Sequence, residues 1–326
     1  MTLNIVGKRY WWFALSLLII LPGVFFLVTE GLRLSIDFTG GTLWEVQFSH
    51  PVQPGAVKDV LAQYGYGNAE VQTTQDNGVQ IRMKELKEAS DTKNQIEQSL
   101  QAKFGPINEQ TASFESVGPT LGNAIRNRAI VAVGIASIGI LLYIAYAFRK
   151  THNPFAFGIC ALLAMLHDVL VVVGIFAFLG WWKGVEVDAL FVTALLTVIG
   201  FSVHDTIVVF DRIRENLAHR AGRSFEEVVN YSLDQTLVRS LNTSLTVIFT
   251  LLALFLLGGT TIKWFVFALL VGIVSGTYSS IFNASQLLVV WENRELQHFF
   301  ARLRGRAPQP APGAGAGTGT GRVASR

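Results

Sequence analysis

The chain has 326 residues, of which 51% are hydrophobic and only 15% charged, and its mean hydropathy is +0.41. Soluble domains carry roughly a quarter charged residues, so this composition excludes an ordinary soluble protein and favours a membrane protein. A formal net charge of +3 without a basic stripe indicates no nucleic-acid partner. The single cysteine, Cys160, excludes an internal disulfide framework.

Six apolar stretches are long enough to cross a bilayer, which takes about 20 helical residues. They cover residues 10–29, 129–148, 155–180, 189–210, 241–258 and 264–290. The first follows Lys8 and Arg9, as the apolar region of a signal peptide would. It is long for such a region and has no small-residue cleavage site, so we expect an uncleaved anchor.

Basic residues gather on one side of these stretches. They are Lys8, Arg9, Arg149, Lys150, Arg212, Arg214, Arg220, Arg223, Arg239, Arg294, Arg302, Arg304 and Arg306. The opposite short loops hold only Lys183 and Lys263. By the positive-inside rule, both termini are expected in the cytoplasm, in a multi-pass protein of the cell (inner) membrane that contacts lipid.

Four parts of the chain follow from this topology. They are residues 1–29 (cytoplasmic N-terminus and first span), 30–125 (an extracytoplasmic domain), 126–295 (a five-helix bundle) and 296–326 (a cytoplasmic tail). The tail is rich in Pro, Gly and Ala from about residue 305 and has no apolar periodicity. We expect it to be disordered from that point.

The segment outside the membrane has the pattern of one small α+β domain. Alternating or β-rich runs predict strands over 43–48, 69–74, 79–84 and 108–117, and helical patterns cover 54–65 and 90–105. The middle two strands are joined by "QDNG", whose Asn-Gly is a strong hairpin signal. The order β-α-β-β-α-β is that of a ferredoxin-like domain.

The stretch "GFSVHDTIVVFDRIREN", residues 200–216, places a carboxylate within the fourth apolar stretch. Asp205 is about sixteen residues from the start of that stretch, roughly 24 Å along a helix. An ionisable residue at membrane depth costs several kcal/mol and is by default a functional candidate. The alternative is that the span ends earlier and Asp205 is interfacial, but four apolar residues, 207–210, follow before the next charge.

Arg239 is the candidate partner of Asp205, because it enters the fifth apolar stretch from the cytoplasmic side. Its alternative role is that of a snorkelling anchor. The residues after it are Ser240, Asn242, Thr243, Ser244 and Thr246. Such polarity suggests a helix that faces protein or water. An arginine would favour the charged form of Asp205 and burial the neutral form, a balance that a proton relay requires.

Three further groups at membrane depth are weaker candidates for the proton pathway. Asp168 lies beside His167 near the middle of the third stretch. Its two possible roles are a proton relay and a structural hydrogen bond between helices. His204 is a candidate because histidine is the residue type suited to proton exchange near neutral pH, but on a helix it points about 100° away from Asp205. A packing role for His204 is an equal alternative.

Four sequence blocks, "SIDFTGGTLWEVQF", "SVGPTLG", "FSVHDTIVVFDRIREN" and "RSLNTSLTVIFT", follow one another from the first to the fifth apolar stretch. By themselves the glycines of "DFTGG" indicate a turn into the first strand. Together the blocks resemble the SecF family, the smaller subunits of bacterial SecD–SecF protein-export complexes. The matching motif residues are Asp37, Phe38, Thr39, Gly40, Gly41, Asp211 and Arg212. The chain departs from the family at Phe201 and His204, where Tyr and Asn are frequent.

The resemblance implies an α-helical membrane fold of the proton-driven efflux-pump (RND) type, with six transmembrane helices and a small ferredoxin-like domain. It implies SecD as partner, assistance to a SecY-containing translocon, unfolded preproteins as substrates and use of the proton-motive force. Asp205 and Arg239 match residues that the family uses in its proton pathway. Protons are then the coupling ion, and no other cofactor or metal is expected.

Two rival functions remain open. The first is that the chain is half of an efflux pump for small molecules or lipids. This function predicts an aromatic-rich substrate cavity in the outer domain, and the domain is small for such a cavity. A passive scaffold of the translocon predicts that replacing Asp205 has no effect. An enzyme is not expected, because the sequence has no G-x-S-x-G, no H-E-x-x-H and no glycine-rich phosphate loop with its lysine.

Overall fold

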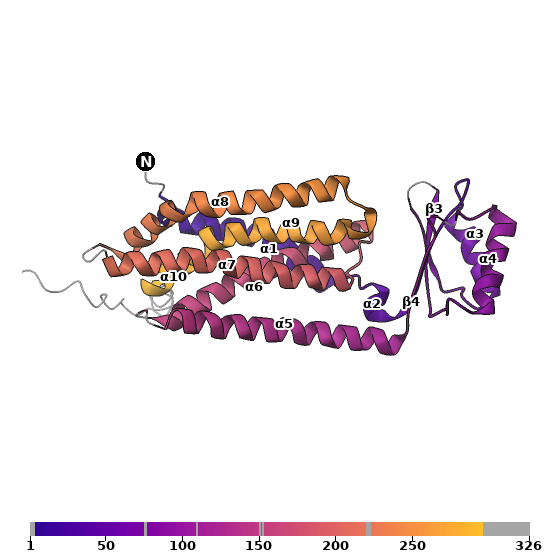
Figure 1. Cartoon of the computed structure of the whole chain (residues 1–326), viewed down its shortest axis with the longest axis horizontal. Coiled ribbons are helices and arrows are strands. Elements are labelled where there is room, and N and C mark those ends of the chain that lie inside the picture. Colours follow the sequence, from indigo (N-terminus) through magenta and orange to yellow (C-terminus); the bar gives the residue numbers. More distant parts are fainter. Residues whose placement is uncertain are drawn as a thin grey trace, which may run out of the picture.

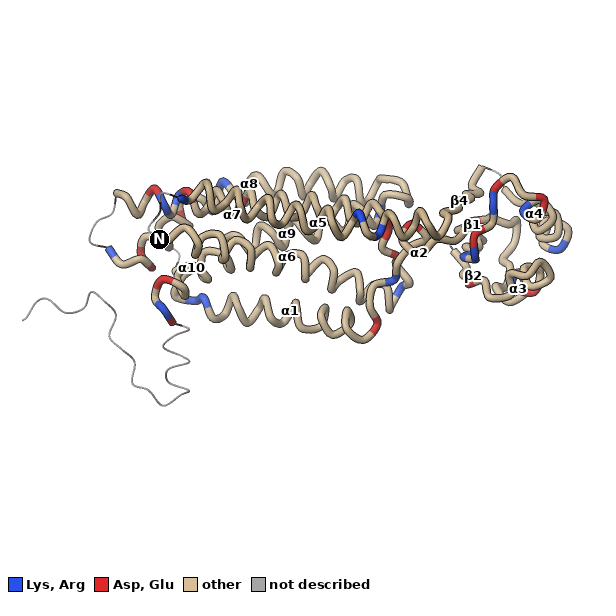
Figure 2. Tube along the Cα trace, turned by 90° about the horizontal axis from the view of Figure 1, so that it is seen from below, with Lys and Arg blue, Asp and Glu red and all other residues tan. Residues whose placement is uncertain are grey.

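The computed structural model describes residues 4–74, 77–108, 110–149, 151, 153–219 and 223–295. The expected disordered tail lies outside these residues. Figure 1 shows long helices side by side in a bundle, with a sheet and two shorter helices beyond one end. We call this end of the bundle the domain end and the opposite one the far end. Figure 2 shows charged residues mainly at the two ends of the bundle and on the sheet domain.

Within the described parts of the chain, six helical segments are long and apolar enough to cross a membrane, which confirms the number of spans expected. Five are the helices α1 (Arg9–Thr29, after the short turn η1, Val6–Lys8), α5 (Pro119–Ala147), α6 (Pro154–Lys183), α7 (Ala189–His219) and α8 (Phe225–Leu257). The sixth begins after η2 (Thr260–Ile262) and consists of α9 (Lys263–Ser279), the π-helical turn η3 (Ser280–Ala284) and α10 (Ser285–Glu292).

Several helices extend well beyond the apolar stretches that predicted them. Helix α5 begins at Pro119, ten residues before its apolar stretch, and α8 begins at Phe225, sixteen residues before. Proline suits the first turn of α5 because that turn needs no donor there. At the start of α8, Ser224 and Glu227 form a capping box. Hydropathy marks only the membrane-depth part of a helix, whereas capping marks where it begins.

The bundle has a buried centre and an exposed periphery. Helices α6, α7 and α9 bury about half of their apolar windows or more, whereas α1, α5 and α8 leave most of theirs exposed. At one contact between the two groups, α1 and α6 meet at Gly23 and Gly174, whose backbones leave no room for a side chain. Such small residues allow close helix packing in membranes.

The sheet domain has the predicted ferredoxin-like order. Its elements are β1 (Gly41–Gln47), α3 (Pro54–Gln63), β2 (Glu70–Thr73), β3 (Gly78–Met83), α4 (Asp91–Phe104) and β4 (Ser113–Val117). The strands lie in the order β2-β3-β1-β4, and every neighbouring pair is antiparallel. Both helices cover one face of the sheet (Figure 1), where they bury apolar residues including Leu61, Ile81 and Ile96. Strand β4 begins five residues later than expected.

The sheet domain is joined to the bundle through the loop between α6 and α7. Arg82 of β3 donates to Glu186 in this loop, and Arg33 Nε lies 3.6 Å from the same carboxylate. Asp37 Oδ2 accepts a hydrogen bond of 2.9 Å from the backbone N–H of Ala189, the first residue of α7. The start of α7 is therefore held by the segment that leads into β1.

A polar cluster joins three helices at the far end. Arg9 at the start of α1 lies 2.5 Å from Glu295 and 3.2 Å from Glu226 of α8. Tyr10 donates to Glu295 at 2.7 Å, and Asn293 donates to it at 3.3 Å. Burial by itself raises the pKa of Glu295, but the hydrogen bonds from Tyr10, Arg9 and Asn293 outweigh it and hold the pKa below the usual 4.5.

We expect this cluster to make stability depend on pH. Because the folded-state pKa of Glu295 is lowered, its contribution is present above pH 4.5 and is lost as the pH falls through the folded-state value. Replacement of Glu295 by Gln should lower the free energy of unfolding by about 1–2 kcal/mol at neutral pH. Thermal unfolding in detergent at several pH values measures both effects. An acid-induced loss of equal size in the variant would contradict the assignment.

Candidate functional site

Asp205 lies inside the bundle, as its sequence position predicted. Its residue is 3% exposed, and the hydrogen-bond donor at its carboxylate is Ser244 of α8, whose Oγ lies 3.5 Å from Oδ2. Thr277 of α9 in turn donates to Ser244 Oγ at 2.6 Å. The contact to Asp205 is at the limit of hydrogen-bond length and is therefore weak. This carboxyl group connects three helices through one weak contact.

Arg239 is not paired with Asp205 in this structure. Among the described residues no ion pair joins the two, and the Arg239 side chain is exposed. Arg239 precedes Ser244 by five residues, so it lies more than one turn closer to the far end and about 140° around the helix. There it lines a surface hollow of about 520 Å³ together with Asp211, Arg212 and Gln235.

Asp168 is fully buried, and several side chains donate hydrogen bonds to its carboxylate. Ser202 of α7 donates to Oδ2 at 2.5 Å, and Ser279 of α9 donates to the same oxygen at 2.6 Å. Ser275 of α9 donates to Oδ1 at 2.7 Å, and His167 Nδ1 lies 2.9 Å from Oδ1. Asp168 therefore ties α6, α7 and α9 together with strong contacts.

The two carboxylates differ in how strongly their surroundings hold them. Among the described residues, Asp168 has four polar partners at 2.9 Å or less, whereas Asp205 has one hydrogen-bond partner, at 3.5 Å. A group held by many short hydrogen bonds has little freedom to change partners. Of these two buried carboxyl groups, Asp205 is therefore the one whose partners can change more easily.

The two histidines lie in different surroundings. His167 is buried beside Asp168, and its ring lies 6.1 Å from that of Tyr278 in a stacked arrangement. His204 is exposed on the outer face of α7, and no hydrogen bond joins it to Asp205 among the described residues. His204 and Asp205 point in different directions because successive residues of a helix are 100° apart around its axis.

The "DFTGG" motif forms the corner between the first span and the sheet domain. Residues Ile36–Thr39 make the single helical turn α2, which Ser35 caps by accepting from the N–H of Asp37 at 3.2 Å. Phe38 is buried, and Thr39 Oγ1 donates to the carbonyl of Ser35 at 3.0 Å. The predicted Gly-Gly turn into β1 is confirmed.

Gly40 and Gly41 both need the absence of a side chain. Gly40 has φ 71° and ψ 165°, and Gly41 has φ 126°. A Cβ on Gly40 would lie 2.7 Å from Pro119 Cα, and one on Gly41 would lie 2.8 Å from the carbonyl oxygen of Met83. Gly122 of α5 packs on the other side, where a Cβ would lie 2.8 Å from Gly40 N. The glycines therefore let α2, β1 and α5 meet.

Asp211 and Arg212 lie on the exposed part of α7 near the far end. Arg214 donates to Asp211 at 2.6 Å. Arg212 donates to Glu215 and to Gln235 of α8, each at 2.6 Å. These contacts position the walls of the hollow that Arg239 also lines.

The sequence analysis missed the serine partners of Asp168. Ser275 and Ser279 are four residues apart on α9, a spacing that places them on one face of a helix. That spacing could have indicated a polar face toward the bundle interior. Ser202 has no such signal, because a lone serine in a transmembrane helix more often bonds to its own backbone.

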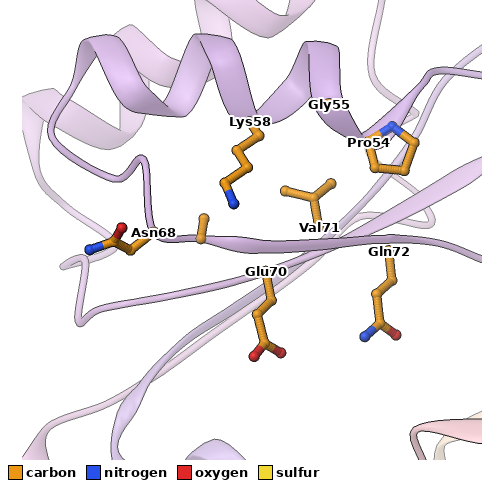
Figure 3. A pocket seen from close by; sticks show the side chains of 8 residues that line it. Pro54, Gly55, Lys58, Asn68, Glu70, Val71 and Gln72 are labelled. Carbon is orange, nitrogen blue, oxygen red and sulfur yellow. The ribbon is translucent and has the colours of Figure 1, made fainter.

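The sheet domain has a hollow of its own between α3 and the edge strand β2. It is lined by Pro54, Gly55, Lys58, Asn68, Ala69, Glu70, Val71 and Gln72. In Figure 3, Lys58 extends from α3 toward the strand, while Glu70 and Gln72 point away on its other side. Residues 70 and 72 share a face because side chains alternate along a strand. None of these eight lining residues is aromatic.

Two family models match the chain. The model described as "Protein export membrane protein SecD/SecF, C-terminal" matches residues 95–294. The model described as "SecD/SecF GG Motif" matches residues 25–52, which include the glycine corner. Between them they cover the end of the first span, parts of the sheet domain and the other five spans.

Similar proteins of known name and known structure agree with these matches. Protein translocase subunit SecF of Thermobaculum terrenum is 62% identical over 92% of this chain and 97% of that protein. The same-named protein of Anaerolinea thermophila is 47% identical over the same shares. The crystal structure of SecDF, a translocon-associated membrane protein from Thermus thermophilus, matches with TM-score 0.77 and 34% identity over 90% of this chain. The chain spans about two fifths, 39%, of that longer SecDF chain.

Proposed function

Because the chain belongs to the SecF family of protein translocase subunits, we propose that it couples the proton-motive force, together with SecD, to preprotein movement through a SecY-containing translocon. The family makes it an accessory subunit of a translocase rather than a classical enzyme. It is a multi-pass membrane protein, and the match to SecDF supports SecD as its partner. The family assignment also speaks against the small-molecule efflux alternative.

The location in the cell is part of the proposal. The far end carries most of the basic residues of the short loops, so we place it in the cytoplasm and the sheet domain outside the inner membrane. In that orientation the sheet domain faces preprotein that has left the translocon, and the hollow lined by Arg239 opens to the cytoplasm.

The observation that carries the proposal is the loosely held carboxyl group of Asp205 at the centre of an apolar bundle. Burying a carboxylate without a cation is costly, whereas a neutral carboxyl group needs only hydrogen-bond partners. We propose that Asp205 carries a proton when Ser244 is its partner, as here, and gives it up when the bundle changes conformation. Asp168, held by four partners, serves instead as the fixed polar anchor of the same helices.

Arg239 is the proposed counter-charge for the ionised form. The contacts between Asn216 and Ser232 and between Asp205 and Ser244 show that α7 and α8 run antiparallel, which puts Arg239 about one turn from Asp205 toward the far end. A rotation of α8 together with a small slide along α7 would bring the guanidinium toward the carboxylate. Protonation would release it again.

Movement of α7 has a direct route to the sheet domain. Asp37 holds the first N–H of α7, and Ser35 N–H donates to the carbonyl of Val187 at 2.8 Å, just before α7 begins. Glu186 in the same loop pairs with Arg82 of the sheet. A shift of α7 therefore pulls on the sheet domain, which we propose then acts on the emerging chain.

The energy available is sufficient for such a switch. A proton that crosses the membrane releases roughly 2.3 kcal/mol per 100 mV of potential. Each 1.4 kcal/mol changes an equilibrium by about tenfold, so one proton can reverse a nearly balanced two-state equilibrium.

We expect Asp205→Asn to abolish the part of preprotein export that an imposed proton gradient stimulates. The test uses membrane vesicles that contain SecD, the translocon and this chain, with export measured as protease-protected preprotein. The amide keeps the shape of the side chain but cannot ionise, so folding and SecD binding should be unchanged.

Asp211→Asn is the matched control, because Asp211 is an exposed carboxylate of the same helix that bonds to Arg214. It should retain gradient-stimulated export. If Asp205→Asn also retained it, the relay would have to involve Asp168 or SecD, and a passive scaffold would become the better description.

A further inference from the structure

Four buried hydroxyl groups follow one another along one side of α8. They belong to Ser232, Thr236, Ser240 and Ser244, spaced every four residues and between 0% and 6% exposed. Residues four apart on a helix are neighbours, separated by about 6 Å along its axis. We call this set the hydroxyl ladder. Other polar residues of this part of α8, such as Asn242, are exposed, so the four buried hydroxyls mark the side of the helix that faces the bundle.

The inner end of the hydroxyl ladder touches the candidate proton site. Ser244 Oγ lies 3.5 Å from Asp205 Oδ2. The hydroxyl ladder reaches the surface at Thr236, its second member, which lines the hollow that Arg239, Asp211 and Glu215 also line. Ser240 is the one ladder residue between the surface hollow and the hydroxyl that contacts Asp205.

Ser240 differs from the other members in that its hydroxyl has no partner among the described residues. Ser232 donates to the carbonyl of Val228 at 2.8 Å, and Thr236 donates to the carbonyl of Ser232 at 3.0 Å, as hydroxyls in helices usually do. Buried polar groups are nearly always hydrogen-bonded to protein or to ordered water. A buried, unpaired hydroxyl at this point therefore indicates a position where water binds.

The spacing suits such water molecules. Residues about 6 Å apart along the helix axis are too far apart for their hydroxyls to touch, but one or two water molecules with hydrogen bonds of about 2.8 Å each can bridge such a gap. A second buried polar atom without a partner among the described residues is Gln286 Oε1 of α10. The contacts from Ser244 to Thr277 and from Glu226 to Asn293 place Gln286 beside the level of Thr236.

We infer that the hydroxyl ladder, with water bound between its members, is the route by which the proton of Asp205 exchanges with the far-end hollow. The inference rests on the proposed function only in that the proposed function says what the proton of Asp205 is used for. At each step an O–H bond breaks in the donor and one forms in the acceptor, so every hydroxyl and water ends as it began. The net change is one proton moved between Asp205 and the water of the hollow.

Arg239 itself is a poor carrier for this step. A guanidinium has only donors and keeps its charge, so it cannot accept a proton from a neighbour. Its positive charge at the hollow, next to Arg212, would also oppose a proton passing close by. The neutral hydroxyls inside the bundle avoid both problems, and the water of the hollow accepts the proton that leaves the hydroxyl ladder.

The test follows the exchange of the Asp205 proton for deuterium by infrared spectroscopy of the full chain with SecD in lipid vesicles. The carboxyl band that Asp205→Asn removes identifies the group. We expect Ser240→Ala to slow its exchange roughly tenfold, the rate equivalent of about one hydrogen bond lost at the barrier. Folding should be unaffected, because the deleted hydroxyl has no protein partner among the described residues.

Thr236→Val tests the next member, with the same volume and no hydroxyl, and should also slow the exchange. Thr250→Ala is the matched control: its exposed hydroxyl lies on the same helix and bonds to the carbonyl of Thr246. Wild-type exchange in both Ser240→Ala and Thr236→Val would overturn the ladder as a route.

The outcome is separable from the proposed function. Slow exchange in Ser240→Ala combined with normal gradient-stimulated export in Asp205→Asn would keep the ladder as the access route and reject Asp205 as the coupling group. Normal exchange in Ser240→Ala with loss of export in Asp205→Asn would keep the coupling group and reject the ladder.

Discussion

Asp168→Ala should lower the free energy of unfolding by about 3–5 kcal/mol, because it removes the common acceptor of three buried hydroxyls. Ser202, Ser275 and Ser279 donate to this carboxylate from two other helices at 2.5–2.7 Å. Their loss loosens the contacts of α6 with α7 and α9 at once. Thermal unfolding in detergent, followed by the loss of monodisperse protein, measures the change.

Two further variants define the reason for that loss. Ser275→Ala removes one donor and leaves the carboxylate with its others, so it should cost only about 1 kcal/mol. Asp168→Asn keeps the shape and one acceptor oxygen, and hydroxyls can turn to accept from the amide, so its cost should be intermediate. A stability of Asp168→Ala equal to that of the wild type would refute the anchor role.

The same variants separate the anchor role of Asp168 from the relay role that its sequence position also allowed. An anchor predicts that stability and export fall together in Asp168→Ala, and that Asp168→Asn exports in proportion to its folded fraction. A relay predicts that Asp168→Asn folds normally and loses gradient-stimulated export completely.

Gly40→Ala is the second substitution for which we expect a large effect, a loss of about 2–5 kcal/mol in the stability of the corner between bundle and sheet domain. Its φ of 71° with ψ of 165° is a backbone region that residues with a side chain avoid. The new Cβ would also lie 2.7 Å from Pro119 Cα. Backbone atoms at the start of α5 cannot move aside as a flexible side chain could.

Gly31→Ala is a matched control, because Gly31 has nearly the same φ of 73° but no atom within 4 Å of the added Cβ. It should cost only about 1 kcal/mol, the penalty for a positive φ. Limited proteolysis of the segment around α2, together with thermal unfolding, measures both variants. Equal losses in the two would show that the contact with Pro119 has no energetic role.

The sequence by itself determined the architecture. Hydropathy is a property of consecutive residues, so six apolar windows sufficed to predict six spans. Strand and helix patterns with an Asn-Gly turn likewise predicted the order of elements in the sheet domain. The depth of Asp205 followed from counting residues along one helix. Each of these inferences needs only local sequence and the fixed rise of a helix.

Only the tertiary structure decided which side chains meet across helices. Helices α6 and α9 are apolar on most sides, so their sequences carry little information about which face turns inward. The rotation of each helix in the bundle places Ser202 and Ser279 at Asp168, and it turns Arg239 outward while Ser240 and Ser244 turn inward. A hydrogen bond requires its donor and acceptor to be placed to within about an ångström. The rotation of each helix decides this placement, and the packing of the whole bundle sets that rotation.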